Sequence, residues 1–178
     1  MPIHTLHCRQ TLDVDREQAW HFFSDPRNLA RITPPALDFQ IVTPDLPAAI
    51  HPGMMIQYRV RPLLGIAMRW LTEITHVEAG HFFVDEQRVG PYAIWHHEHH
   101  FRDAGPGRVE LEDRVTYRLP FGWLSEPMHA LVVRDQLQAI FAHRRQAVKA
   151  IFPPRPGEAK ESLIPPAPTP VSQTLVHT

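Results

Sequence analysis

Alternation of apolar and polar residues dominates the chain between residues 3 and 119, and a period of two predicts β-strands. Turn-forming residues separate the alternating segments. The clearest turn is Ala104-Gly105-Pro106-Gly107, which predicts a hairpin between the last two strands. The expected strands are residues 3–12, 38–43, 54–61, 67–77, 81–89, 93–102 and 108–119.

Two short helices are expected after the first strand. Asp15 is a suitable N-cap for a helix over residues 16–23. Asp25 and Pro26 suit the cap and first position of a second helix, with Leu29 and Ile32 on its buried side. The dipeptide Pro34-Pro35 is expected to end that helix, because proline cannot continue a helical hydrogen-bond ladder.

One long helix is expected from Ser125 to Phe152. Its apolar stripe predicts a face packed on the sheet, and the opposite side is expected to be solvated with ion pairs of small individual value. The apolar stripe comprises Val133, Leu137, Ile140, Phe141, Val148 and Ile151. The expected solvated side comprises Arg134, Asp135, Gln138, Arg144 and Arg145, with the alternative that one of them guards the mouth of a pocket.

The order of elements predicts an α+β fold: a curved, seven-stranded antiparallel sheet wrapped around one long C-terminal helix. Such a helix-grip arrangement encloses a space between sheet and helix, where a ligand would sit. Residues 1–152 are expected to form this single domain. Residues 153–178 contain seven prolines in 26 positions and few large apolar residues, so a disordered tail is predicted.

Composition and charge exclude several classes of partner. The net charge of −1 and the pI of about 6.9 carry no signal for nucleic acid. No apolar run approaches the ~20 residues of a membrane span, and the N-terminus lacks the pattern of a signal peptide. The single cysteine, Cys8, allows no internal disulfide. A cytoplasmic protein is therefore expected, and its oligomeric state is left open.

Four of the thirteen histidines lie within the segment Trp95-His96-His97-Glu98-His99-His100-Phe101. On a strand, His97 and His99 share one face with the aromatic rings of Trp95 and Phe101. This face resembles the wall of a half-buried cavity. The other face carries His96, Glu98 and His100 and is expected to be solvated. Buried polar groups need partners, so the partners of His97 and His99 become the central question.

The hairpin pattern supplies one such partner. On the last strand, Asp113 shares a face with Val115 and Tyr117, and this apolar face must point inward. In either register that keeps the apolar faces together, Asp113 lies beside His97 or His99. A carboxylate beside an imidazole favours the imidazolium, so a raised histidine pKa is expected.

Several motifs resemble the START-like, helix-grip superfamily, which includes polyketide cyclases and dehydrases, lipid-transfer START domains and birch-pollen-allergen proteins. The chain is similar above all to an uncharacterised bacterial subfamily of SRPBCC-type proteins. The resemblance covers about residues 3–152 and implies a deep hydrophobic pocket between sheet and C-terminal helix. The matching residues are Ala19-Trp20, Phe22-Phe23, Asp25-Pro26, Asn28-Leu29, Trp70, Asp85-Glu86-Gln87, Gly90-Pro91-Tyr92, Trp95, His97, His99, Phe101, Asp113-Arg114-Val115, Tyr117 and Leu119-Pro120-Phe121-Gly122.

The residues expected to contact a ligand combine apolar walls with a polar anchor. The strand over residues 81–89 stays ambiguous: either Phe83, Asp85 and Gln87 face the cavity, or the alternate positions do. The resemblance favours Asp85 and Gln87 as the special positions. The full candidate set is Ile56, Tyr58, Trp70, Asp85, Gln87, Trp95, His97, His99, Phe101, Asp113 and Tyr117.

Binding or carrying a small hydrophobic or amphipathic molecule is the preferred function. The first alternative is a cyclase- or dehydratase-type enzyme, in which His97 or His99, polarised by Asp113, acts as general acid and base. The second alternative is a non-enzymatic protein-interaction module. A His-x-His pair can also hold a metal, with Asp113 as a third ligand. Such pairs are common on strands without metal, so no metal or other cofactor is predicted.

Overall fold

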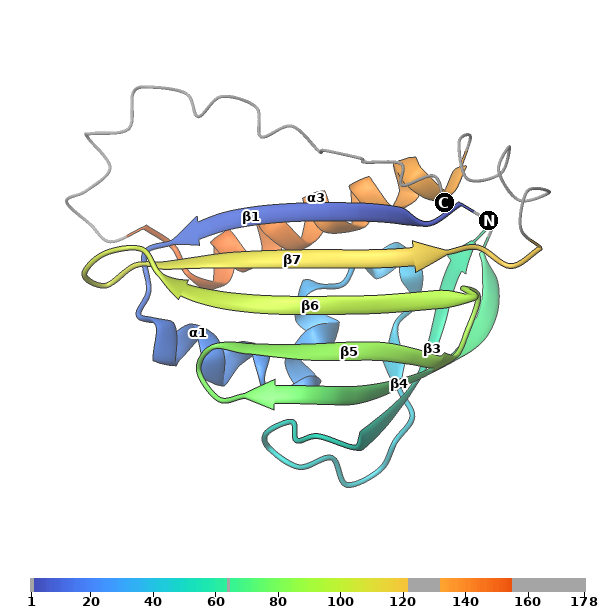
Figure 1. The fold of residues 1–178 in the computed structure, drawn as a ribbon, viewed down its shortest axis with the longest axis horizontal. Helices are drawn as coiled ribbons and strands as arrows, with labels where there is room; N and C mark the ends of the chain where they lie inside the picture. Colours follow the sequence, from blue (N-terminus) through green and yellow to red (C-terminus); the bar gives the residue numbers. More distant parts are fainter. Residues whose placement is uncertain (1, 64, 122–131, 155–178) are drawn as a thin grey trace.

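The computed structural model describes residues 2–63, 65–121 and 132–154. The strands form one antiparallel sheet in the order β1-β7-β6-β5-β4-β3-β2, and the helices lie on one face of this sheet (Figure 1). The strands are β1 (His4–Leu12), β2 (Gln40–Ile41), β3 (Met54–Leu63), β4 (Ile66–Glu78), β5 (Phe82–Val89), β6 (Ile94–Asp103) and β7 (Val109–Arg118). The helical segments are α1 (Arg16–Phe23), η1 (Pro26–Ile32), η2 (Pro35–Leu37) and α3 (Arg134–Ile151).

This architecture confirms the expected seven-stranded α+β helix-grip fold. The predicted hairpin joins β6 to β7, where Gly105 and Gly107 adopt positive φ angles of 110° and 65°. Glycine takes this backbone conformation at no steric cost. The strand expected over residues 38–43 is shorter than the pattern suggested, since only Gln40 and Ile41 pair, against β3.

The short helices differ from expectation in detail. Asp25 caps η1 as predicted, its side chain accepting a hydrogen bond from the backbone N–H of Arg27 at 3.0 Å. This segment, however, is a 3-10 helix rather than an α-helix. As predicted, this helix ends before Pro34-Pro35, at Ile32, and Pro35 begins a separate 3-10 turn. Asp15 is the N-cap of α1 (Arg16–Phe23) as predicted, and its side chain makes no capping hydrogen bond to the helix.

Within the described residues, α3 runs from Arg134 to Ile151. The earlier part of the expected helix, residues 125–131, lies outside the described residues, and so does the predicted tail from residue 155 onward. The predicted apolar stripe is confirmed at Leu137, Phe141 and Val148, which are the buried residues of α3. None of the described helices combines the length and the apolar composition that a bilayer crossing requires.

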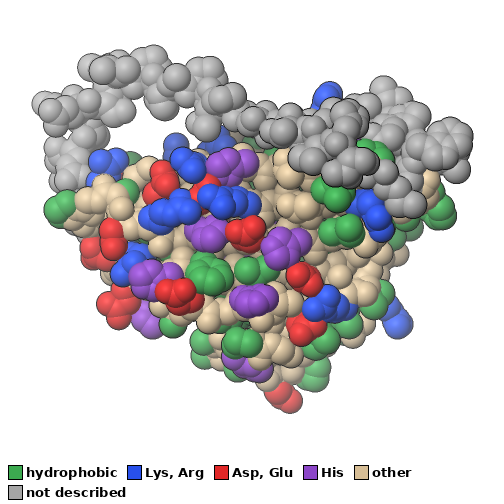
Figure 2. Space-filling view, viewed as in Figure 1, with side chains coloured by type: hydrophobic (Ala, Val, Ile, Leu, Met, Phe, Trp, Pro, Cys, Tyr) green, Lys and Arg blue, Asp and Glu red, His purple; other side chains and the backbone are tan. Residues whose placement is uncertain are grey.

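The outer face of the sheet carries paired charges rather than freely solvated ones. His96, Glu98 and His100, expected on a solvated face, are only half exposed. His96 lies 2.9 Å from Glu86, and His100 lies 2.7 Å from Glu98. Figure 2 shows acidic, basic and histidine side chains interspersed over this face.

Glu112 lies at the centre of this charged face, and its side chain is 0% exposed. Arg9 and Arg114 each approach its carboxylate at 3.0 Å, and Arg102 and His7 complete the ring of partners. Burial raises the pKa of this carboxyl, but the hydrogen bonds from the surrounding arginines outweigh burial and hold the pKa well below its usual range.

We therefore expect Glu112 to contribute to the acid sensitivity of folding. A depressed pKa contributes stability above the ordinary value of 4.5, and this contribution is lost as the pH falls toward the depressed pKa. In denaturant titrations, Glu112→Gln should flatten the fall in unfolding free energy below pH 4.5 relative to the parent. The control Glu110→Gln changes a less buried carboxylate on the same strand and should keep the parental slope. Equal slopes for the parent and Glu112→Gln would contradict this expectation.

Candidate functional site

A largely apolar cavity of about 200 Å³ lies between the sheet, the short helical segments and α3. For scale, an engineered apolar cavity of ~150 Å³ accepts benzene. Its apolar walls come from Phe22, Phe23, Leu29, Ile32, Leu37, Phe39, Ile50, Ile56, Val60, Trp70, Ile74, Phe83, Trp95, Leu137, Ile140 and Phe141. Polar groups gather at one part of the lining, where Asp85, His97, His99 and Arg144 meet.

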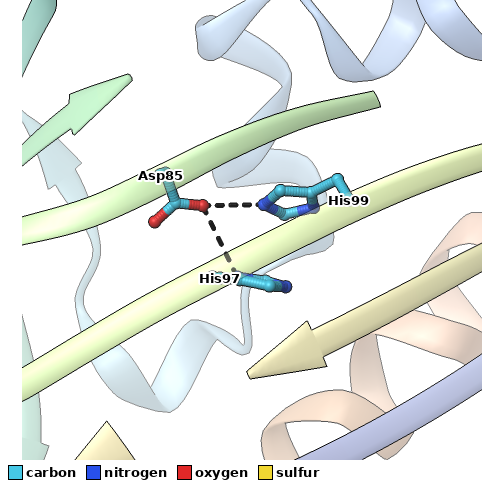
Figure 3. Close-up of side chains that lie close together, drawn as sticks. All are labelled: Asp85, His97 and His99. Atoms are coloured by element: carbon cyan, nitrogen blue, oxygen red, sulfur yellow. Dashed lines mark hydrogen bonds and ion pairs between the residues drawn. The ribbon is translucent and has the colours of Figure 1, made fainter. Parts of the chain in front are cut away.

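Strand register brings these polar side chains together. Asp85 on β5 pairs with His97 on β6, and His99 on β6 pairs with Asp113 on β7. Because alternate residues of a strand share a face, both histidines point inward from β6, with ring centroids 3.7 Å apart. Figure 3 shows Asp85 reaching across from the neighbouring strand toward both imidazoles. The predicted pairing of Asp113 with the histidines is confirmed.

Each imidazole lies between two carboxylates. His97 places Nε2 at 3.0 Å from Asp113 Oδ1 and Nδ1 at 3.5 Å from Asp85 Oδ2. His99 places Nδ1 at 3.0 Å from Asp113 Oδ1 and Nε2 at 2.7 Å from Asp85 Oδ2. The side chains of His97 and His99 are 6% and 8% exposed, so these contacts are sheltered from water. We name the group Asp85, His97, His99, Asp113 and Arg144 the polar cluster.

Arg144 is the member of the polar cluster that sequence reasoning placed wrongly. It was expected on the solvated side of the C-terminal helix, but its side chain is only 13% exposed and lies 3.3 Å from Asp113 Oδ1. The spacing of Leu137, Phe141, Arg144 and Val148 follows the apolar stripe at intervals of three and four residues. That register was the available signal that Arg144 faces inward.

The polar cluster shifts the pKa values of its members in opposite directions. Burial raises the pKa of Asp113, but Arg144 and both histidines outweigh burial and hold that pKa well below its usual range. The same balance lowers the pKa of Asp85, mainly through His99 and His97. Both carboxyl groups are therefore ionised at neutral pH.

The two histidines differ, which corrects part of the expectation. Burial lowers the pKa of His99, yet its hydrogen bonds to Asp113 and Asp85 outweigh burial and raise the pKa, as expected for a carboxylate neighbour. For His97, burial and the adjacent His99 prevail over the carboxylates, so its pKa is lowered. The proximity of the two rings contributes to this difference, because a positive charge on His99 disfavours a second positive charge on His97.

Seven of the eleven predicted site residues line the cavity. The ambiguous strand is resolved, since Phe83 and Asp85 face inward. Trp95, which the sequence placed on the expected cavity wall, packs edge-on against Trp70 at a centroid distance of 5.3 Å. The seven residues are Ile56, Tyr58, Trp70, Asp85, Trp95, His97 and His99.

The other four predicted residues do not line the cavity. Phe101 lies in the core against Trp20, and Tyr117 is buried in a second core cluster beside Tyr92. Asp113 sits behind the histidines and contacts them from their far side. Gln87 donates a hydrogen bond to the backbone oxygen of Tyr92 at 2.6 Å, so it holds the β5–β6 connection.

Sequence reasoning missed the walls supplied by the helical segments. Phe22 and Phe23 of α1, and Leu29 and Ile32 of η1, all line the cavity. Their apolar character predicted burial, but nothing in the local pattern separates a residue that fills the core from one that borders a cavity. That distinction depends on how far the helical segments stand from the sheet.

No protein-family model matches this chain, and no curated protein is similar to it in sequence. Solved structures do resemble it. CV1439 from Chromobacterium violaceum gives a TM-score of 0.65 at 12% identity, covering 85% of this chain and 99% of that one. Major latex-like protein 151 from Panax ginseng gives 0.63 at 13% identity, covering 86% of this chain and 100% of that one.

Ms6760 from Mycobacterium smegmatis gives a TM-score of 0.56 at 18% identity, covering 83% of this chain and 92% of that one. At such identities a structural likeness shows the fold alone. Together with the sheet order and the helix held against the sheet, this likeness shows that the chain has the helix-grip fold.

Proposed function

We propose that the protein binds a small, mainly apolar molecule in the cavity between the sheet and α3. The observation that carries the proposal is the cavity itself, whose largely apolar walls include the polar side chains of Asp85, His97, His99 and Arg144. An apolar pocket with a few convergent polar groups is the usual form of a small-molecule site. In this arrangement the walls supply affinity, while Asp85, His99 and Arg144 orient a polar end of the ligand.

A carrier or binding role is favoured over general acid–base catalysis by the hydrogen bonds of the histidines. A catalytic base needs a nitrogen free to reach the substrate. In His97 and His99 both nitrogens of each ring lie between 2.7 and 3.5 Å from a carboxylate oxygen. These rings therefore serve as part of a fixed polar network, which suits recognition better than proton transfer.

A pure protein-interaction module fits the structure less well. Such a module gains nothing from a cavity, because unfilled volume in a core costs stability. The cavity borders buried residues from both sheet and helices, including Ile56 and Leu137. A ligand that fills the cavity would offset this cost in stability, which accounts for the cavity in a binding protein.

The proposal is tested by native mass spectrometry of freshly purified protein, compared with its denatured mass. An organic molecule lost on denaturation would support the binding role, and extraction would identify its class. The same protein, stripped of bound molecules, should then bind anilinonaphthalene sulfonate with enhanced probe fluorescence. A protein that carries no organic molecule and binds neither this probe nor a fatty acid would overturn the proposal.

A cavity-filling variant gives a sharper prediction. Ile140 on α3 lines the cavity, whereas its neighbour Ala139 is exposed. We expect Ile140→Trp to weaken binding of anilinonaphthalene sulfonate at least about tenfold, because the indole would occupy the space that the probe needs. Ala139→Trp adds the same side chain outside the cavity and should keep the parental affinity, measured by fluorescence titration. Equal affinities for both variants would place the probe elsewhere.

A further inference from the structure

Asp85, His97 and His99 form a group in which three potential metal ligands meet. Each residue offers one ligand atom, and these atoms lie within 4.8 Å of one another. Among the residues that the structure describes, this group is the one with that property. The sequence predicted no metal, and it offered Asp113 as the candidate third ligand if His97 and His99 held one. The structure instead brings Asp85 to the side of the histidines that faces the cavity.

The spacing of these atoms suits a metal ion. Imidazole nitrogens bind Zn²⁺ at about 2.0–2.1 Å, which places neighbouring ligands of a tetrahedral site about 3.3 Å apart. Asp85 Oδ2 lies 2.7 Å from His99 Nε2 and 3.5 Å from His97 Nδ1. These distances lie on either side of the required spacing, so small side-chain shifts would admit the ion.

Asp113 occupies the place of an outer carboxylate. Metal-binding histidines usually engage a carboxylate or carbonyl through the ring nitrogen that does not face the metal, and this contact fixes their orientation. Asp113 Oδ1 lies 3.0 Å from His97 Nε2 and 3.0 Å from His99 Nδ1, both on the far side from Asp85. Arg144 lies 3.3 Å from Asp113 Oδ1 and 3.3 Å from His99 Nδ1, so its guanidinium approaches the pair from the side of Asp113.

The charge balance favours an added cation. With both imidazoles neutral, the carboxylates of Asp85 and Asp113 outnumber the single guanidinium of Arg144 by one negative charge. Buried charges require compensation, and either a proton or a metal ion supplies it. The three ligands also border the cavity, so a fourth coordination position would be open to a water molecule or a ligand.

We propose that Asp85, His97 and His99 bind one divalent transition-metal ion, with Asp113 orienting the two imidazoles. The mixed nitrogen and oxygen ligands suit Zn²⁺, Fe²⁺ or Co²⁺ rather than Mg²⁺ or Ca²⁺, which prefer oxygen alone. Two histidines and one carboxylate on one side of an ion leave positions free on the other. This inference goes beyond the proposed binding of an apolar molecule, and it uses Asp85 and His99 of the same polar cluster.

The test uses the full chain without an affinity tag, stripped with a chelator and titrated with Co²⁺. We expect a visible absorption band that saturates at one equivalent of Co²⁺, and its loss when Zn²⁺ displaces the cobalt. The shape and intensity of this band report the coordination geometry directly. A parent protein that shows no saturable band and binds no Zn²⁺ by calorimetry would overturn the proposal.

Matched variants on one strand locate the site. His97→Ala and His99→Ala should abolish the band, whereas His96→Ala and His100→Ala change histidines on the opposite face of β6 and should retain it. Asp113→Asn should weaken Co²⁺ affinity about 10–100-fold while the stoichiometry stays at one. Loss of the band in His96→Ala or His100→Ala alone would move the metal to the outer face and refute the assignment.

Folding of the variants is checked separately. Asp85→Asn keeps the shape of the side chain but replaces the charged oxygen, so it tests the third ligand with little change in packing. We expect an at least tenfold loss of Co²⁺ affinity for Asp85→Asn, with a parental far-ultraviolet circular dichroism spectrum. Parental Co²⁺ affinity in a folded Asp85→Asn protein would exclude Asp85 as a ligand and contradict the proposal.

Discussion

Replacing Asp113 by alanine is expected to lower the free energy of unfolding by about 3–5 kcal/mol, the usual cost of removing one partner from a buried ion pair. One oxygen of Asp113 contacts His97 and His99 at 3.0 Å and Arg144 at 3.3 Å. Without this carboxylate, the guanidinium of Arg144 stays buried with its main compensating charge removed. Urea unfolding of parent and variant, both with a chelator present, measures the difference.

The matched control for this prediction is Asp103→Ala. Asp103 ends β6, its side chain is 67% exposed, and it lies 3.5 Å from Arg16. Exposed ion pairs contribute about 1 kcal/mol or less, so this variant should unfold close to the parent. If Asp113→Ala lowered the free energy of unfolding by less than about 1 kcal/mol, the polar cluster would tolerate an unpaired arginine. That result would contradict the role of Asp113 in compensating the charge of Arg144.

The second large effect is expected at Phe101. This ring is 3% exposed and packs against Trp20 and Phe23, with centroid distances of 5.4 and 5.6 Å. Truncation to alanine removes these contacts and leaves a void, so we expect Phe101→Ala to cost about 3–5 kcal/mol of unfolding free energy. Chemical denaturation monitored by tryptophan fluorescence measures this loss.

Phe121→Ala provides the comparison, because that ring is 82% exposed. Its removal should change the unfolding free energy by no more than about 0.5 kcal/mol. The pair of variants separates a structural aromatic from an exposed one within the same chain. Similar small losses of unfolding free energy in both variants would mean that the contacts of Phe101 in the core do not stabilise the fold.

Much of the fold follows from local patterns in the sequence. Alternation places Leu6, Ile56 and Val115 on one face of their strands, and all three are buried. Alternation with a period of two can be recognised from a few neighbouring residues, and glycines such as Gly105 mark the turns. The pairing of His99 with Asp113 was predictable for the same reason, because a hairpin couples two adjacent strands whose apolar faces must coincide.

The inward direction of Asp85 was not predictable in this way. Both faces of its strand carry apolar and polar residues, so hydrophobicity favours neither. Pairing between β4 and β5 also shifts register near Thr72 and near Ile74, which breaks simple alternation. Only the neighbouring strands decide that Asp85 meets His97 and His99.

Taken by itself, the sequence determined the seven-stranded helix-grip fold, the shared inward face of His97 and His99, and their meeting with Asp113. These features depend on local periodicity and on one hairpin. The tertiary structure decided which aromatics border the cavity and which fill the core, and it brought Arg144 and Asp85 to the histidines. Those outcomes depend on where α3 lies against a curved sheet, which is settled by packing between residues far apart in the chain.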